Sequence, residues 1–124
     1  MKVTHIMLCL RILTKTDKWL HAYNFNQYDD VFIGHRGCAR ISDCQKKYPF
    51  LVEVRTDPLK PRLYEYRLNW ENINNSMEQL KVTDIEVWKY LKQVLEEKGV
   101  RIKIKKLVPE YQENGTVRMV EKYI

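Results

Sequence analysis

The feature that most constrains the fold is a helical segment that ends at a proline and leads straight into two alternating segments. Residues 34–47 place Ala39, Ile41 and Cys44 on one side at helical spacing, and Pro49 ends the helix. Two segments of period two follow, with apolar positions at Phe50, Val52, Val54, Tyr64, Tyr66 and Leu68. The loop between them holds two prolines, which prevent strand pairing there. This order predicts a helix followed by a β-hairpin.

Two further helices are predicted upstream. Residues 4–13 carry an apolar face formed by Ile6, Cys9, Leu10 and Leu13. The pattern predicts a shorter helix over residues 18–27, whose inward positions are Trp19, Leu20 and Tyr23. Residues 28–34 are then expected to form the turn that leads to the third helix. Three helices and a hairpin in this order are typical of a winged helix-turn-helix, which offers one helix to the DNA major groove and the hairpin, or wing, to the flanking backbone.

The remaining residues predict a helix and a second hairpin. Residues 69–80 are polar and rich in asparagine, so we expect a connector with Trp70 as its anchor. Thr83 and Glu86 are spaced as a capping box, and the apolar stripe behind them is Val87, Trp88, Leu91, Val94 and Leu95. Gly99 is expected to end this helix. Apolar and basic residues then alternate over residues 100–105, and Asn114-Gly115 is a strong signal for a hairpin turn. The predicted fold class is therefore α+β, with a winged helix-turn-helix over residues 1–68 and a helix-hairpin extension over residues 69–124, for dimerisation or docking.

Composition excludes several classes of protein. The chain of 124 residues is 44% hydrophobic and has few glycines and prolines, which argues for a folded core. No apolar run approaches the roughly 18 residues of a membrane span, so we expect no membrane association and a cytoplasmic location. The three cysteines, of which none is in a C-x-x-C motif, are expected to be reduced and buried.

The positive charge is concentrated in the predicted winged helix. Residues 1–70 carry 12 lysines and arginines against 7 acidic residues, whereas residues 71–124 carry 10 against 9. An excess of basic residues on one unit favours contact with phosphates, although solubility alone could account for a modest net charge of +6.

Two stretches resemble a known family. The segment Ala39-Arg-Ile-Ser-Asp-Cys-Gln-Lys-Lys-Tyr-Pro49, followed by Tyr64-Glu-Tyr-Arg-Leu68, is similar to the recognition helix and wing of small phage and prophage helix-turn-helix proteins. The resemblance covers residues 4–68. It departs from the family pattern at Cys44, where leucine is usual, and at Gln45, where a basic residue is common.

The resemblance implies that the protein binds double-stranded DNA, as a phage or mobile-element transcriptional regulator or as an accessory replication factor. His35, Arg36, Arg40, Lys46 and Lys47 would then lie on the recognition helix, with Arg36 and Arg40 close to base edges. Arg55, Lys60 and Arg62 would lie on the wing and contact the DNA backbone. Winged-helix regulators usually act as dimers, so a homodimer on two half-sites is expected.

Other classes of function have less support. A small factor that binds a protein, such as a phage inhibitor of a host protein, could use the same scaffold. Zinc is not expected, because His21, His35, Cys38 and Cys44 fit no standard finger spacing. A nuclease would need an acidic cluster, and Asp29-Asp30 is more typical of a turn. We expect no enzyme activity and no cofactor, since no phosphate-binding loop or nucleophile motif is present.

Overall fold

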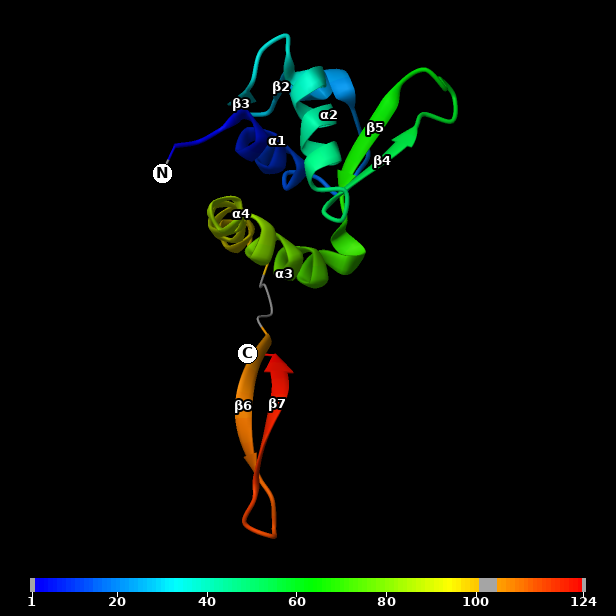
Figure 1. Ribbon diagram of the computed structural model, residues 1–124. Coiled ribbons are helices and arrows are strands. Elements are labelled where there is room, and N and C mark those ends of the chain that lie inside the picture. The colour runs from blue at the N-terminus through cyan, green and yellow to red at the C-terminus, as the bar shows by residue number, and fades with distance from the viewer. Residues whose placement is uncertain (1, 101–104, 124) are drawn as a thin grey trace.

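The computed structural model describes residues 2–100 and 105–123 and has a mixed α+β architecture (Figure 1). The helices in this part of the chain are α1 (His5–Leu13), α2 (Gly37–Lys47), α3 (Ile73–Thr83) and α4 (Ile85–Glu97), with short 3-10 turns η1 (Ala22–Phe25) and η2 (Trp70–Asn72). The strands are β1 (Leu20–His21), β2 (Gln27–Tyr28), β3 (Val31–Phe32), β4 (Val52–Thr56), β5 (Tyr64–Leu68), β6 (Lys105–Tyr111) and β7 (Val117–Tyr123). None of the helices in the described residues is long and apolar enough to cross a bilayer.

The first and third predicted helices are present. Thr4 caps α1, and its Oγ1 accepts a hydrogen bond from the Met7 N–H at 3.3 Å. Cys9, Leu10 and Leu13 of α1 are buried, as the spacing predicted. Helix α2 begins at Gly37 rather than at Gly34, because Gly34 has a φ of 104° and turns the chain before the helix starts.

The predicted second helix over residues 18–27 is wrong. Its residues form β1, η1 and β2, and the predicted turn contains β3, which pairs with β2. Leu20 of β1 pairs with Tyr66 of β5, so this segment extends a sheet instead of forming a helix. The Asn24 side chain also accepts a hydrogen bond from the His21 N–H at 3.0 Å, a local bond that competes with helical pairing.

The predicted hairpin is formed by β4 and β5, and β1 lies beside β5 to give the strand order β1-β5-β4. The pairing is antiparallel, with Val52 opposite Leu68 and Val54 opposite Tyr66. Near the base of the hairpin the predicted apolar positions are buried, since Val52, Tyr66 and Leu68 all lie in the core. The hairpin then extends past the helices (Figure 1), which leaves Val54 and Tyr64 exposed.

The predicted connector over residues 69–80 is also wrong, because most of it is helix α3. Asparagine has a low helix propensity, but burial of Met77 and Leu80 compensates for it. The Ser76 hydroxyl is buried and donates to the Phe50 carbonyl oxygen at 2.8 Å. This bond ties α3 to the residue just before the β4–β5 hairpin.

Helices α3 and α4 share one continuous hydrophobic core with α1 and α2. Helix α1 packs against both α2 and α4, and α3 packs against α4. The core therefore crosses the expected boundary near residue 68, and the helical part of the predicted extension docks on the first unit.

The start of α4 differs from the predicted capping box. Asp84, not Thr83, is the N-cap, and its Oδ1 accepts from the Val87 N–H at 3.2 Å. The Thr83 hydroxyl instead donates to the Gln79 carbonyl oxygen in α3. The other carboxylate oxygen of Asp84 accepts from the buried Tyr48 hydroxyl at 2.7 Å. One aspartate thus caps α4 and joins it to the end of α2.

The second predicted hairpin is present as β6 and β7, with Val108 opposite Val120. The turn includes Asn114 and Gly115, and Gly115 has a φ of 83°, as the predicted turn requires. Of the alternating segment predicted at 100–105, residues 101–104 lie outside the described residues.

We predict that Asp84→Ala lowers the free energy of unfolding by about 2 kcal/mol, because it removes a helix cap and a buried hydrogen-bond acceptor. Tyr48→Phe removes only the hydrogen bond and should cost about 1 kcal/mol. Urea denaturation of both variants measures these losses. Glu86→Ala, an exposed substitution on the same helix turn, is the control and should change stability by less than about 0.5 kcal/mol.

Candidate nucleic-acid interface

The entry into α2 is fixed by a close backbone contact. A Cβ atom at Gly37 would lie 2.1 Å from the carbonyl oxygen of Phe25 in η1, so only glycine fits there. At Gly37 the approach is to η1, and it holds the start of α2 against the segment that leads from β1.

Three predicted site residues lie together at the start of α2. His35 and Arg36 are exposed, and Arg40 is half-buried one turn further on. With His5 of α1 and Phe32 of β3, they line a hollow of about 320 Å³. No side chain caps this end of α2, and its first turn carries no acidic residue. The positive end of the helix dipole and a group of basic side chains therefore coincide.

Arg40 lies on α2, as the resemblance implied, but it is half-buried. It lies at the flank of α2 that faces α1, and its positive charge acts on the Cys9 thiol of that helix. Its Nε atom is buried and has no hydrogen-bond partner among the described residues. Although Asp43 lies three residues further along the helix, the described residues show no ion pair between it and Arg40. Arg40 therefore borders the hollow but does not lie at the centre of the exposed face.

The exposed face of α2 consists of Ala39, Asp43, Lys46 and Lys47. Its two ends are basic, with Arg36 before the first turn and the two lysines in the last turn. The carboxylate of Asp43 lies between them. This face therefore combines positive ends with an acidic middle, an arrangement that suits phosphates only at the ends.

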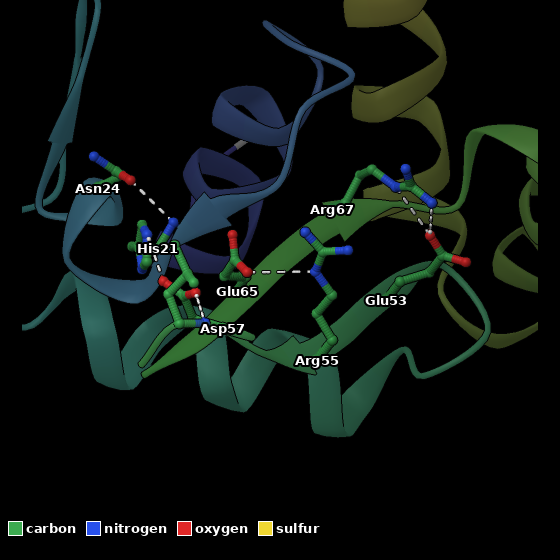
Figure 2. Close-up of polar contacts among 8 residues, drawn as sticks. His21, Asn24, Glu53, Arg55, Asp57, Glu65 and Arg67 are labelled. Atoms are coloured by element: carbon green, nitrogen blue, oxygen red, sulfur yellow. Dashed lines mark hydrogen bonds and ion pairs between the residues drawn. The ribbon is translucent and has the colours of Figure 1, made fainter. Parts of the chain in front are cut away.

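The loop between β4 and β5 is closed by Asp57 (Figure 2). The Asp57 N–H donates to the Leu63 carbonyl oxygen at 2.8 Å, and its Oδ1 accepts from the Leu59 N–H at 2.8 Å. Its Oδ2 lies 3.4 Å from the His21 Nε2, which links the loop to β1. Lys60 and Arg62, both predicted site residues, are exposed on this loop.

Arg55, the third basic residue predicted for the wing, is engaged by the protein itself. Its guanidinium lies 4.2 Å from the centre of the Trp19 ring, and its Nε lies 3.3 Å from Glu65 Oε1. Arg67 stacks on the same ring at 4.5 Å and pairs with Glu53 at 2.9 Å. Figure 2 shows both arginine–glutamate pairs across β4 and β5. Arg55 thus stabilises the sheet, and Trp19 covers the sheet instead of anchoring the core.

The sequence patterns did not identify two residues of this region, Asp57 and His21, as part of the site. Asp57 precedes a proline at the start of a loop, which is a usual place for an aspartate that bonds the following backbone, so its role had a signal. His21 was assigned to a helix, and only the pairing of β1 with β5 brings it to Asp57. No local pattern could have indicated that contact.

The cysteines and acidic residues form no metal site among the described residues. Burial raises the pKa of the Cys9 thiol to about 12 and also raises the pKa of Cys44, so both are poor nucleophiles. Asp29 and Asp30, considered for a nuclease, lie at the β2–β3 turn and pair with Lys15 at 3.2 and 2.7 Å. Their carboxylates are therefore engaged by a lysine.

The buried Glu65 makes Arg55 a test of sheet stability. Glu65 is only 7% exposed, so Arg55→Ala leaves a buried carboxylate without this partner and should cost about 1–3 kcal/mol of unfolding free energy. Arg55→Ala combined with Glu65→Gln should cost less than the sum of the two single changes, by at least about 0.5 kcal/mol in urea denaturation. Strict additivity would show that the pair contributes nothing.

Gly37→Ala should lower the unfolding free energy by about 3 kcal/mol, because the added methyl group overlaps the Phe25 backbone, which cannot move aside cheaply. Gly115→Ala is the matched control. Among the described residues, no atom lies close to a Cβ placed at Gly115, so the only cost of alanine there is its positive φ. The loss of unfolding free energy should therefore be about 1 kcal/mol. Thermal and urea unfolding measure both; equal losses would argue against the close contact.

Comparisons of the chain with protein-family models, with curated proteins and with solved structures gave no match. The resemblance of residues 4–68 to phage helix-turn-helix proteins therefore stays a prediction. What supports a function is the arrangement of α2, its basic ends and the β4–β5 loop.

Proposed function

We propose that the protein binds double-stranded DNA as a winged helix, with α2 in the major groove and the β4–β5 loop against the flanking backbone. The observation that carries the proposal is the order α1, β1, η1, β2, β3, α2, β4, β5, in which α2 leads into the β4–β5 hairpin and β1 pairs with β5. Basic residues lie at the ends of α2 and on the hairpin loop. A groove-binding helix followed by a hairpin that reaches the backbone is the geometry of this class.

The start of α2 is the strongest candidate for contact with DNA. An uncapped helix N-terminus without acidic residues attracts anions, and His35 and Arg36 add donors beside it. Arg36 is exposed and suits either a phosphate or a guanine edge. Arg40 would act from the side, within the hollow at this end of the helix.

Asp43 indicates how the helix would be oriented. An exposed carboxylate in the middle of the DNA-facing side repels phosphates but accepts a hydrogen bond from the cytosine amino group. Lys46 and Lys47 in the last turn and Lys60 and Arg62 on the loop would then supply the contacts to the backbone. The middle of α2 would face base edges, and its ends and the loop would face phosphates.

A cytoplasmic regulator or an accessory replication factor of a phage or mobile element is the role that fits this proposal. Dimers are the usual form of such regulators, so a twofold-symmetric site with half-sites about one helical turn apart is expected. No cofactor and no catalytic residue is needed for this role.

A second candidate is binding to another protein, and Leu59 favours it. Its side chain is 91% exposed at the tip of the β4–β5 loop, which is unusual for a leucine next to two prolines and two basic residues. An apolar side chain at a rigid tip is a suitable anchor for a pocket on a partner protein. Leu59→Ser would weaken such a complex and leave salt-dependent DNA binding in place.

The test is the salt dependence of binding to a random 30-base-pair duplex, measured by fluorescence anisotropy. The logarithm of affinity should fall with the logarithm of salt concentration by about 0.9 for each phosphate contact. Lys60→Ala/Arg62→Ala should reduce that slope by about 2, and Arg36→Ala should weaken binding by about 1–3 kcal/mol.

Lys81→Ala/Lys89→Ala is the matched control, since it removes two exposed lysines from α3 and α4. This control lowers net charge as much as the loop variant but should leave the slope nearly unchanged. If the control and the loop variant weaken binding equally, the attraction comes from net charge and the proposed interface is wrong. If the unmodified protein does not bind duplex DNA at low salt, the DNA-binding proposal is wrong.

A further inference from the structure

Among the described residues, the part of the β6–β7 hairpin from Pro109 to Met119 packs against no hydrophobic partner. Every side chain from Pro109 to Met119 is exposed, with Tyr111 79%, Val117 54% and Met119 55% exposed. In Figure 1 the hairpin lies apart from the four helices. An isolated two-stranded hairpin is marginally stable in water, and a third strand or a packed face is needed for independent stability.

The pairing of the hairpin determines which backbone groups face outward. The Gln112 N–H donates to the Thr116 carbonyl oxygen at 2.9 Å, so these residues form a hydrogen-bonded pair. Hydrogen-bonded and non-hydrogen-bonded pairs alternate along an antiparallel ladder. The pairs Tyr111–Val117 and Pro109–Met119 are therefore non-hydrogen-bonded, and their backbone polar groups point away from the hairpin.

The two edges of the hairpin consequently differ. Pro109 lies at an outward position of β6 and has no N–H, so it blocks strand addition along that edge. The edge of β7 carries outward N–H and C=O groups at Val117 and Met119, and no hydrogen bond from them to the rest of the described chain is formed. Of the two edges of this hairpin in the described residues, the β7 edge is therefore the one open to an added strand.

Strand β7 is complementary to itself. Consider β7 paired antiparallel with a second copy of itself, centred on Met119. Residues whose backbone polar groups point outward then lie opposite one another: Met119 opposite Met119, and Val117 opposite residue 121. Arg118 then lies opposite Val120 of the second copy, which avoids a like-charge pair. A pairing centred on Val120 would set Arg118 opposite a lysine at position 122, and like charges directly opposite are destabilising.

We propose that β7 is a dimerisation strand, and that two copies of the chain join edge to edge into a four-stranded sheet with the order β6-β7-β7-β6. Such a sheet has enough strands to be stable, and its twofold axis passes Met119. The two Met119 side chains then meet across the seam, on the face of the sheet that also carries the exposed Tyr111 and Val117 of both copies. The inference concerns the chain without DNA and does not depend on the proposed function.

The experiment is sedimentation equilibrium of the full chain without DNA, from about 5 to about 500 µM, a range suited to the weak dimer that roughly six backbone hydrogen bonds would hold. The unmodified chain should dimerise with a dissociation constant on the order of 10–100 µM. Met119→Pro should abolish the dimer, because it removes one outward N–H while leaving the ladder inside the hairpin intact. Met119→Thr keeps that N–H and should dimerise within about threefold of the unmodified chain.

A second measurement does not rely on how the proline variant folds. In a Cys38→Ser background, Met119→Cys should form a covalent dimer under mild oxidation, and Glu110→Cys on β6 should not. A chain that is monomeric at the highest concentration overturns the proposal. A dimer that survives Met119→Pro, a failure of Met119→Cys to cross-link, or equal cross-linking through Glu110→Cys overturns it as well.

Discussion

The close contact between Gly37 and the Phe25 carbonyl is the constraint on which the arrangement of the candidate interface depends. It holds the start of α2 against η1, and η1 follows directly from β1. Strand β1 in turn pairs with β5, so this approach of backbone to backbone connects α2 to the β4–β5 hairpin. It acts together with the short link from α2 to β4, in which the Val52 N–H donates to the Tyr48 carbonyl oxygen. A side chain larger than hydrogen at position 37 would overlap the Phe25 backbone and push the start of α2 away from η1.

A second connection extends this arrangement to the C-terminal helices. The Tyr48–Asp84 hydrogen bond joins the residue after α2 to the cap of α4, and Ser76 joins α3 to the segment before β4. Because a buried tyrosine hydroxyl needs a partner, this contact favours one orientation of α4 over others. The four helices therefore form a common support for the hairpin and α2.

The sequence allowed the elements with strong local signals to be predicted. Helix α1, helix α4, the β4–β5 hairpin and the Asn114-Gly115 hairpin follow from apolar spacing and turn residues. Helix α3 was missed because its asparagines, which have a low helix propensity, conceal an apolar face that only packing reveals. The second helix was predicted wrongly because Leu20 of β1 pairs with Tyr66 of β5, which is distant in the sequence. Of the candidate site, Lys60 and Arg62 lie on the predicted loop, whereas Arg36 lies at the N-cap of α2, just before the helix that was predicted to contain it. The engagement of Arg55 by Trp19 and Glu65 depends on cross-strand register, which local patterns do not specify.

The way in which Asp57 closes the β4–β5 loop makes the tip of that loop exchangeable. The closing hydrogen bonds use the Asp57 carboxylate and the main chain of Leu59, Lys60 and Leu63, and not their side chains. Substitutions at Leu59, Lys60 and Arg62 therefore alter what the loop presents to solvent without loosening the hairpin that carries it. The loop is a site at which new recognition could evolve, or could be engineered by grafting, on an unchanged scaffold.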